Sequence, residues 1–124
     1  MGVCEPKDVS AFKDPEIEIS VQDAAALLGS GEAVLVDVRE PHEWDAGRIP
    51  GARHVQLEHL ASQADTIPRD TRVIFQCRLG VRSAMATKAF RASGYDAVSM
   101  AGGIEAWHDA GLPMDPPDGR VADH

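Results

Sequence analysis

The stretch QCRLGVRS, residues 76–83, places a cysteine between two segments of different character. Cys77 follows an apolar run typical of a buried strand, and a loop with one glycine and two arginines comes after it. An alanine-rich segment from Ser83 then has the pattern of a helix. A cysteine at such a junction is either a small buried apolar residue or a nucleophile, and the loop around it favours the nucleophile.

The residues after the cysteine indicate how a thiolate would be stabilised there. If the chain turns after Cys77 and enters a helix near Ser83, the backbone N–H groups of residues 78–82 surround the sulfur. Gly80 permits either a positive φ or a close approach of the backbone. The positive end of the following helix favours the thiolate as well, so the loop is predicted to cradle an anion.

The elements that must position this loop alternate between strand and helix patterns. Strand patterns lie at residues 17–19, 33–37, 72–76 and 96–100, and helix patterns lie at residues 21–28, 40–44, 57–62, 83–92 and 104–110. This alternation predicts an α/β fold with a mainly parallel sheet flanked by helices. Sites in such sheets form at the carboxyl ends of strands, where Asp37 and Cys77 are both expected.

Serine and glycine mark the ends of two predicted helices. Ser20, with Asp23 three residues later, is expected to cap the first helix, and Gly29 is expected to end it. Gly102 and Gly103 lack the pattern of a phosphate-binding loop, so we expect a tight connection between a strand and the last helix.

Composition and charge limit the classes of partner. The chain has 124 residues, 44% of them hydrophobic, and its formal net charge is -8. Such a charge argues against nucleic acid as a partner, because phosphate binding needs clustered basic residues. No segment resembles a signal peptide or a membrane span, so we expect a cytoplasmic protein with no membrane partner. The five histidines lack cysteine partners at metal-ligand spacing, so no metal is expected.

The chain is long enough for one ordinary domain with its own core. Residues 17–114 are expected to form this domain. Residues 1–16 lack periodicity and are expected to be an N-terminal extension, in which Cys4 is incidental. Residues 115–124 are polar and rich in proline, so we expect a flexible C-terminal tail.

Four motifs in order resemble the rhodanese family of sulfurtransferases. They are VLVDVREPHEW at 34–44, GRIPGA at 47–52, CRLGVRS at 77–83 and AGGIEAWHDAGLP at 101–113. Each motif is weak alone, but together, in this order and spacing, they are highly specific. The resemblance covers about residues 17–114 and implies a single-domain rhodanese with a rhodanese-like three-layer α/β fold.

The resemblance also implies a mechanism. Cys77 would be the nucleophile and would carry sulfur as a covalent persulfide, with no cofactor. The substrate-binding cradle would comprise Arg78, Leu79, Gly80, Val81 and Arg82. The two arginines are candidates to steer an anionic donor, and either could instead fold back and brace the loop. Asp37 and Arg39 are expected to form an ion pair that braces the cysteine loop. The donor would be thiosulfate or a persulfide such as glutathione persulfide, and the acceptor cyanide, a cellular thiol or a sulfur-relay protein.

The sequence departs from the family pattern in two places, and the second bears on the donor. Arg48 stands where the family commonly has histidine, which affects local hydrogen bonds more than Cys77. Leu79 and Val81 are apolar where many relatives place polar residues. A less polar rim is expected to weaken the capture of small anions and to favour a persulfidated protein or a small persulfide as donor.

Two other functions are compatible with the sequence. A rhodanese-like module that binds a partner for regulation would not need turnover. Cysteine phosphatases and the related arsenate reductases place five residues between their cysteine and arginine, whereas only residues 78–81 separate Cys77 from Arg82. The shorter loop suits one additional sulfur atom better than a phosphate. A phosphatase or arsenate reductase is therefore less favoured than a sulfurtransferase.

Overall fold

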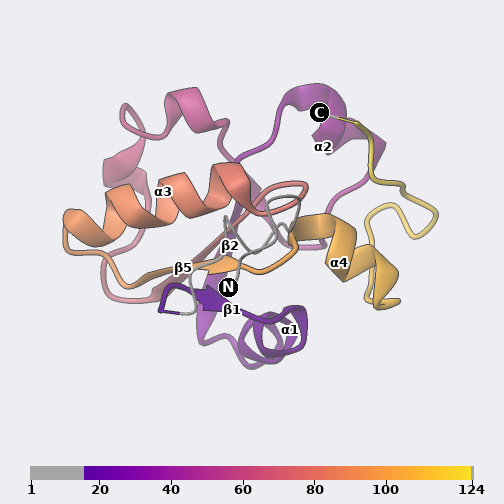
Figure 1. Cartoon of the computed structure of the whole chain (residues 1–124), viewed down its shortest axis with the longest axis horizontal. Coiled ribbons are helices and arrows are strands. Elements are labelled where there is room, and N and C mark those ends of the chain that lie inside the picture. Colours follow the sequence, from indigo (N-terminus) through magenta and orange to yellow (C-terminus); the bar gives the residue numbers. More distant parts are fainter. Residues whose placement is uncertain (1–15, 124) are drawn as a thin grey trace, which may run out of the picture.

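A computed structural model describes residues 16–123, which form an α/β fold of three layers (Figure 1). The strands are β1 (Glu18–Ile19), β2 (Ala33–Asp37), β3 (Arg53–His54), β4 (Arg72–Gln76) and β5 (Ala97–Met100). They build one sheet in the order β1-β5-β4-β2-β3, and all of its strand pairs are parallel. The predicted α/β class with a parallel sheet between helices is therefore confirmed.

Helices cover both faces of this sheet. The α-helices are α1 (Val21–Ser30), α2 (Pro41–Ala46), α3 (Val81–Ala92) and α4 (Gly103–Asp109), and two short 3-10 helices are η2 (Leu57–His59) and η3 (Ala64–Thr66). Figure 1 shows α3 on one side of the sheet and α1 on the other. No helix within residues 16–123 has the length and apolar character needed to cross a membrane.

The central strands are apolar because both of their faces are covered. Along β4, Phe75 faces α3, where its ring lies 4.9 Å from that of Phe90. Ile74 faces the opposite way, into a second apolar cluster with Ile104 of α4. Strand β4, which leads directly into Cys77, is thus packed between two layers. This packing fixes the position at which the cysteine loop begins.

Three elements show the clearest differences from the sequence prediction. Helix α1 starts after Ser20, whose side chain accepts the Asp23 N–H at 3.0 Å as predicted, but it passes Gly29 and is capped by Gly31 at a φ of 77°. The predicted helix at residues 57–62 is only the short 3-10 turn η2. Strand β3 was not predicted, because two half-buried residues carry no detectable alternation.

The start of α4 lies directly against the cysteine loop. The Ile104 N–H donates to the Cys77 carbonyl at 2.8 Å, and the Glu105 N–H donates to the Arg78 carbonyl at 3.2 Å. Gly103, at a φ of 61°, permits this approach, since a Cβ at that position would collide with both carbonyl oxygens. The tight connection expected at Gly102 and Gly103 therefore also anchors the backbone of the cysteine loop.

The C-terminal residues return to α2. Figure 1 shows the end of the chain beside this helix. Arg48 and Asp115 exchange two backbone hydrogen bonds of 3.0 and 2.7 Å, and the Arg120 N–H donates to the Ala46 carbonyl at 3.0 Å. These contacts position residues 115–123. The predicted domain boundaries and the predicted flexibility of this segment stay predictions. Residues 1–15, with Cys4, lie outside the described residues.

Gly103→Ala is expected to destabilise the protein by about 2–3 kcal/mol, because the new methyl group must displace the backbone of the cysteine loop. Gly29→Ala is the matched control. It lies in a helix with open space around its Cα, so it is expected to stabilise by about 0.5–1 kcal/mol. Urea unfolding measures both, and equal effects of the two changes would contradict the anchoring role of Gly103.

Candidate active site

The sulfur of Cys77 lies at the carboxyl end of β4 and at the N-terminus of α3. Its Sγ accepts the Gly80 N–H at 3.1 Å and the Ser83 N–H at 3.4 Å. Gly80 is the N-cap of the twelve-residue helix α3, so both amides belong to the first turn. Backbone donors and the positive end of a helix together favour a thiolate at this position.

Gly80 gives the loop its shape. Its φ is 113°, a conformation that side-chain-bearing residues rarely adopt, and a positive φ is one of the two possibilities expected from the sequence. Because of this turn, the chain comes back over Cys77 within three residues. The loop is thereby short enough for its amides to reach the sulfur.

Two serines extend the polar contacts behind the sulfur. The Ser83 hydroxyl lies 3.6 Å from the Cys77 sulfur, and its Oγ is 2.8 Å from that of Ser99 on β5. Both serines are fully buried. Sequence reasoning missed them as site residues, although a serine within the buried apolar strand β5 is an available signal.

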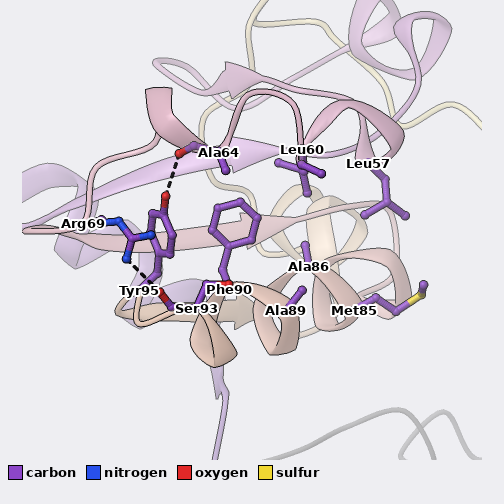
Figure 2. Close-up of a pocket in the computed structure, with 11 residues that line it drawn as sticks. Leu57, Leu60, Ala64, Arg69, Met85, Ala86, Ala89, Phe90, Ser93 and Tyr95 are labelled. Carbon is purple, nitrogen blue, oxygen red and sulfur yellow. Dashed lines mark hydrogen bonds between the residues drawn. The ribbon is translucent and has the colours of Figure 1, made fainter.

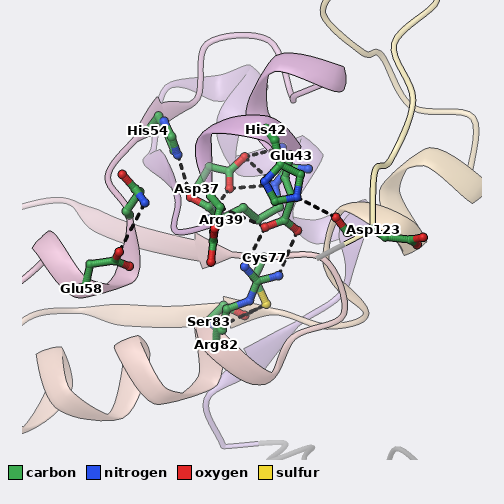
Figure 3. A network of polar contacts seen from close by, with 12 residues as sticks. Asp37, Arg39, His42, Glu43, His54, Glu58, Cys77, Arg82, Ser83 and Asp123 are labelled. Atoms are coloured by element: carbon green, nitrogen blue, oxygen red, sulfur yellow. Dashed lines mark hydrogen bonds and ion pairs between the residues drawn. The ribbon is translucent and has the colours of Figure 1, made fainter.

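Arg82 is held by a carboxylate from another element. Its Nη1 and Nη2 donate to the two carboxylate oxygens of Glu43 on α2 at 2.9 and 3.1 Å (Figure 3). The Glu43 side chain has 0% exposure and that of Arg82 has 16%. A bidentate pair in this position is rigid and desolvated, so it fixes the C-terminal end of the loop.

Electrostatics keep both members of this pair charged. Burial opposes the charged form of Glu43, but hydrogen bonds from Arg82 and from the Glu40 N–H, with the charges of Arg82 and Arg39, outweigh it and lower its pKa. Burial likewise opposes the charged Arg82, whose pKa is nevertheless raised by Glu43, Cys77 and Asp37. Glu43 was not identified from the sequence, because no local pattern predicts that α2 brings it against Arg82 of α3.

Arg78 is also paired with carboxylates. Its Nε lies 3.2 Å from an oxygen of Glu105 on α4, and its Nη2 lies 3.3 Å from an oxygen of Asp123 in the C-terminal segment. The contact with Glu105 is partly exposed and Asp123 is 93% exposed, so both contacts are weaker than the pair formed by Arg82. Sequence reasoning identified neither carboxylate.

Asp37 and Arg39 form a fully buried ion pair, with Nη2 and Oδ2 2.7 Å apart. Arg39 also donates to the Gly47 carbonyl at 2.8 Å, and its own carbonyl lies 2.7 Å from the His54 ring nitrogen. These contacts brace the chain on both sides of α2. The pair thus supports the helix that carries Glu43, and through it Arg82.

The predicted cradle residues surround a small cavity. Its volume is about 210 Å³, and Cys77, Arg78, Leu79, Val81 and Arg82 line it. The Cys77 sulfur forms its floor at 1% residue exposure, whereas Leu79 and Val81 are 50% and 40% exposed at the mouth. The structure therefore brings together the loop residues singled out from the sequence, and Asp37 and Arg39 lie behind them.

A second cavity, of about 490 Å³, lies between α3 and the segment of η2 and η3 (Figure 2). It is lined mainly by apolar side chains such as Leu57 and Phe90. Its polar groups are already engaged: Arg69 donates to the Ser93 carbonyl at 2.8 Å, and the Tyr95 hydroxyl donates to a backbone carbonyl at 2.8 Å. No cysteine, histidine or carboxylate lines this cavity.

Comparisons with known proteins agree with this geometry. The rhodanese-like domain family matches residues 20–110. A sulfurtransferase from Allochromatium vinosum is 36% identical over 94 residues, 75% of this chain and 88% of that protein. A crystal structure of a rhodanese-related protein from Thermoplasma volcanium has a TM-score of 0.75 and 28% identity, covering 79% of this chain and 96% of that one. The structure of a Rhodopseudomonas palustris protein, described as a possible tyrosine phosphatase, has a TM-score of 0.69 and 30% identity. The match covers 98% of this chain and 99% of that one.

The chain belongs to the rhodanese-like domain family. Its similarity to the Allochromatium vinosum sulfurtransferase places it in a family of the sulfurtransferase type. The resemblance seen in the sequence motifs is thereby confirmed, together with the fold that it implied.

Glu43→Gln is expected to reduce stability by about 2 kcal/mol near neutral pH, because Arg82 loses its buried charged partner. The pKa of Glu43 is lowered from its usual 4.5 in the folded protein. Its contribution is therefore present above about pH 4.5 and is lost as the pH falls through the folded-state value. Urea unfolding across this pH range measures the difference between the wild type and the variant.

Asp96→Asn serves as the control, because it breaks the exposed pair between Arg72 and Asp96. We expect a change within about 0.5 kcal/mol. A difference between wild type and Glu43→Gln that stays constant from acid to neutral pH would contradict the proposed role of the charge.

Proposed function

We propose that this protein is a sulfurtransferase that moves a sulfane sulfur from a donor to a thiophilic acceptor through a persulfide on Cys77. The observation that carries this proposal is the position of the sulfur. It accepts the Gly80 and Ser83 amides at the start of α3 and forms the floor of a cavity of about 210 Å³. This arrangement supports both a thiolate nucleophile and a persulfide anion.

In the first half of the cycle, the Cys77 thiolate attacks the outer sulfur of thiosulfate or of a persulfide. A bond forms between Sγ and that sulfur while the sulfur–sulfur bond of the donor breaks. Sulfite or a thiolate leaves with the electron pair of the broken bond. The loop amides hold the negative charge, which now lies on the outer sulfur of Cys77.

In the second half, an acceptor nucleophile such as a thiolate, cyanide or the cysteine of a sulfur-relay protein attacks the outer sulfur. The bond to Sγ breaks, and its electron pair returns to Cys77 as a thiolate. The same amides of Gly80 and Ser83 stabilise this product, so one cradle serves both steps. Both steps are displacements at sulfur, and we propose that they need no cofactor or metal. A cycle that returns to a free thiolate suits a reducing compartment such as the cytoplasm.

Phosphatase activity is the second candidate, because a relative that covers nearly the whole chain is described as a possible tyrosine phosphatase. Two features oppose this activity here. Only four residues separate Cys77 from Arg82. The guanidinium of Arg82 is bound to both carboxylate oxygens of Glu43, whose negative charge opposes the binding of a phosphate beside it.

Intact mass of the reduced protein tests the proposed cycle. After incubation with thiosulfate, or with glutathione persulfide, the wild type is expected to gain one sulfur atom, and cyanide is expected to remove it. Cys77→Ser is expected to gain none. Cys4→Ser is the matched control, because it removes the other cysteine of the chain, and it is expected to gain sulfur like the wild type.

Two results would overturn the proposal. If neither donor adds sulfur to Cys77, the protein is better explained as a module that binds a partner. If p-nitrophenyl phosphate or arsenate is turned over at a rate that Cys77→Ser abolishes, the loop-length argument against phosphatases and arsenate reductases fails.

A further inference from the structure

We infer that the preferred donor is an organic persulfide, R–S–SH, whose group R is apolar and uncharged next to the sulfur. This inference rests on the proposed function, because it names the donor that loads Cys77. Thiosulfate, a small dianion, is the alternative that the site disfavours.

The charge of Arg82 is offset, and its position is fixed, by a buried carboxylate. Both of its terminal nitrogens are bound to Glu43, at 2.9 and 3.1 Å, and the Glu43 carboxylate is fully buried. Turning Arg82 toward a donor would leave this carboxylate buried without its partner, which is strongly unfavourable. Figure 3 shows Arg82 extended from the cysteine loop toward Glu43.

Arg78, on the other side of the loop, lies beside two carboxylates. Glu105 and Asp123 lie 3.2 and 3.3 Å from its guanidinium nitrogens. Together with Glu43, three carboxylates therefore face the two arginines that line the cavity. The whole chain carries a formal charge of -8, so long-range steering of a dianion is unfavourable too.

The rim between these arginines is apolar. Leu79 is 50% exposed and Val81 is 40% exposed, and both line the cavity above the sulfur. Cys77 itself is only 1% exposed, so the outer sulfur of the donor must enter the cavity while the rest of the donor stays at the rim. An apolar group R would cover Leu79 and Val81 and remove their surface from water.

This apolar rim continues along α3. Met85 is 58% exposed and lies four residues after Val81, on the same face of the helix. It lines the larger apolar cavity between α3 and η2, where Figure 2 shows it near one end. Three of the four large hydrophobic side chains exposed within residues 16–123 thus lie in the cysteine loop or the first two turns of α3. They offer contacts to R that thiosulfate cannot use.

The loading step balances without an added oxidant or reductant. The Cys77 thiolate attacks the outer sulfur of R–S–SH, a bond forms between Sγ and that sulfur, and the sulfur–sulfur bond of the donor breaks. The electron pair leaves on the inner sulfur, which takes the proton from the outer sulfur. The products are the Cys77 persulfide anion and the neutral thiol R–SH, so no additional negative charge develops beside the three carboxylates.

The test compares loading rates of Cys77 from thiosulfate, from the persulfide of N-acetylcysteine and from the persulfide of its uncharged methyl ester. Because these donors differ in intrinsic reactivity, each rate is expressed relative to the wild type for the same donor. Leu79→Ser with Val81→Ser is expected to lower kcat/KM for the methyl ester persulfide by about tenfold, with a smaller effect on thiosulfate. Val34→Ser, at an exposed valine in β2, is the matched control and is expected to change neither.

A second pair of substitutions tests the charges. Glu105→Gln with Asp123→Asn releases Arg78 and is expected to raise kcat/KM for thiosulfate by about three- to tenfold relative to the methyl ester persulfide. Asp96→Asn, which breaks an exposed pair with Arg72 elsewhere on the surface, is expected to leave this ratio unchanged.

The possible results separate this inference from the proposed function. If Cys77 is loaded but neither pair of substitutions changes the ratio of the rates for the methyl ester persulfide and thiosulfate, the inference is wrong while the sulfurtransferase stands. If no donor loads Cys77, the proposed function is wrong as well. Rim variants that load from the methyl ester persulfide as fast as the wild type would also contradict a role of the rim in binding R.

Discussion

The cysteine loop is held between the first turns of two helices, and the rest of the site depends on this arrangement. Amides at the start of α3 donate to the sulfur of Cys77, while amides at the start of α4 donate to the carbonyls of Cys77 and Arg78. Each helix thus uses backbone donors that have no partner within the helix. Gly80 and Gly103 allow the two close approaches, because one adopts a positive φ and the other leaves room for carbonyl oxygens.

Charge pairing around this loop defines what the site can bind. A small cavity on a parallel sheet, with two arginines beside a cysteine, would ordinarily be expected to attract anions. Here Glu43 holds Arg82, and Glu105 and Asp123 hold Arg78, so the arginines shape the loop and contribute little free positive charge. The same contacts that make the loop rigid therefore narrow the range of donors.

Much of the fold follows from the sequence because it depends on local patterns. The apolar runs of β2 and β4 and the alternation of strands and helices predicted a parallel sheet, and Ser20 predicted the start of α1. The end of α1 was predicted two residues early, because a helix tolerates Gly29 when a better left-handed cap, Gly31, follows it. The short strand β3 depends on pairing with β2, which local pattern does not report.

The sequence by itself determined the candidate nucleophile and its cradle, because Cys77, Gly80 and Arg82 lie within one short loop whose residue types are informative together. Only the tertiary structure decided which groups meet that loop. Glu43, Ser99 and Asp123 reach it from α2, β5 and the C-terminal segment, far apart in the chain. Periodicity indicates which face of an element is buried, but packing decides what lies against that face. The charge balance of the site is therefore a property of the fold.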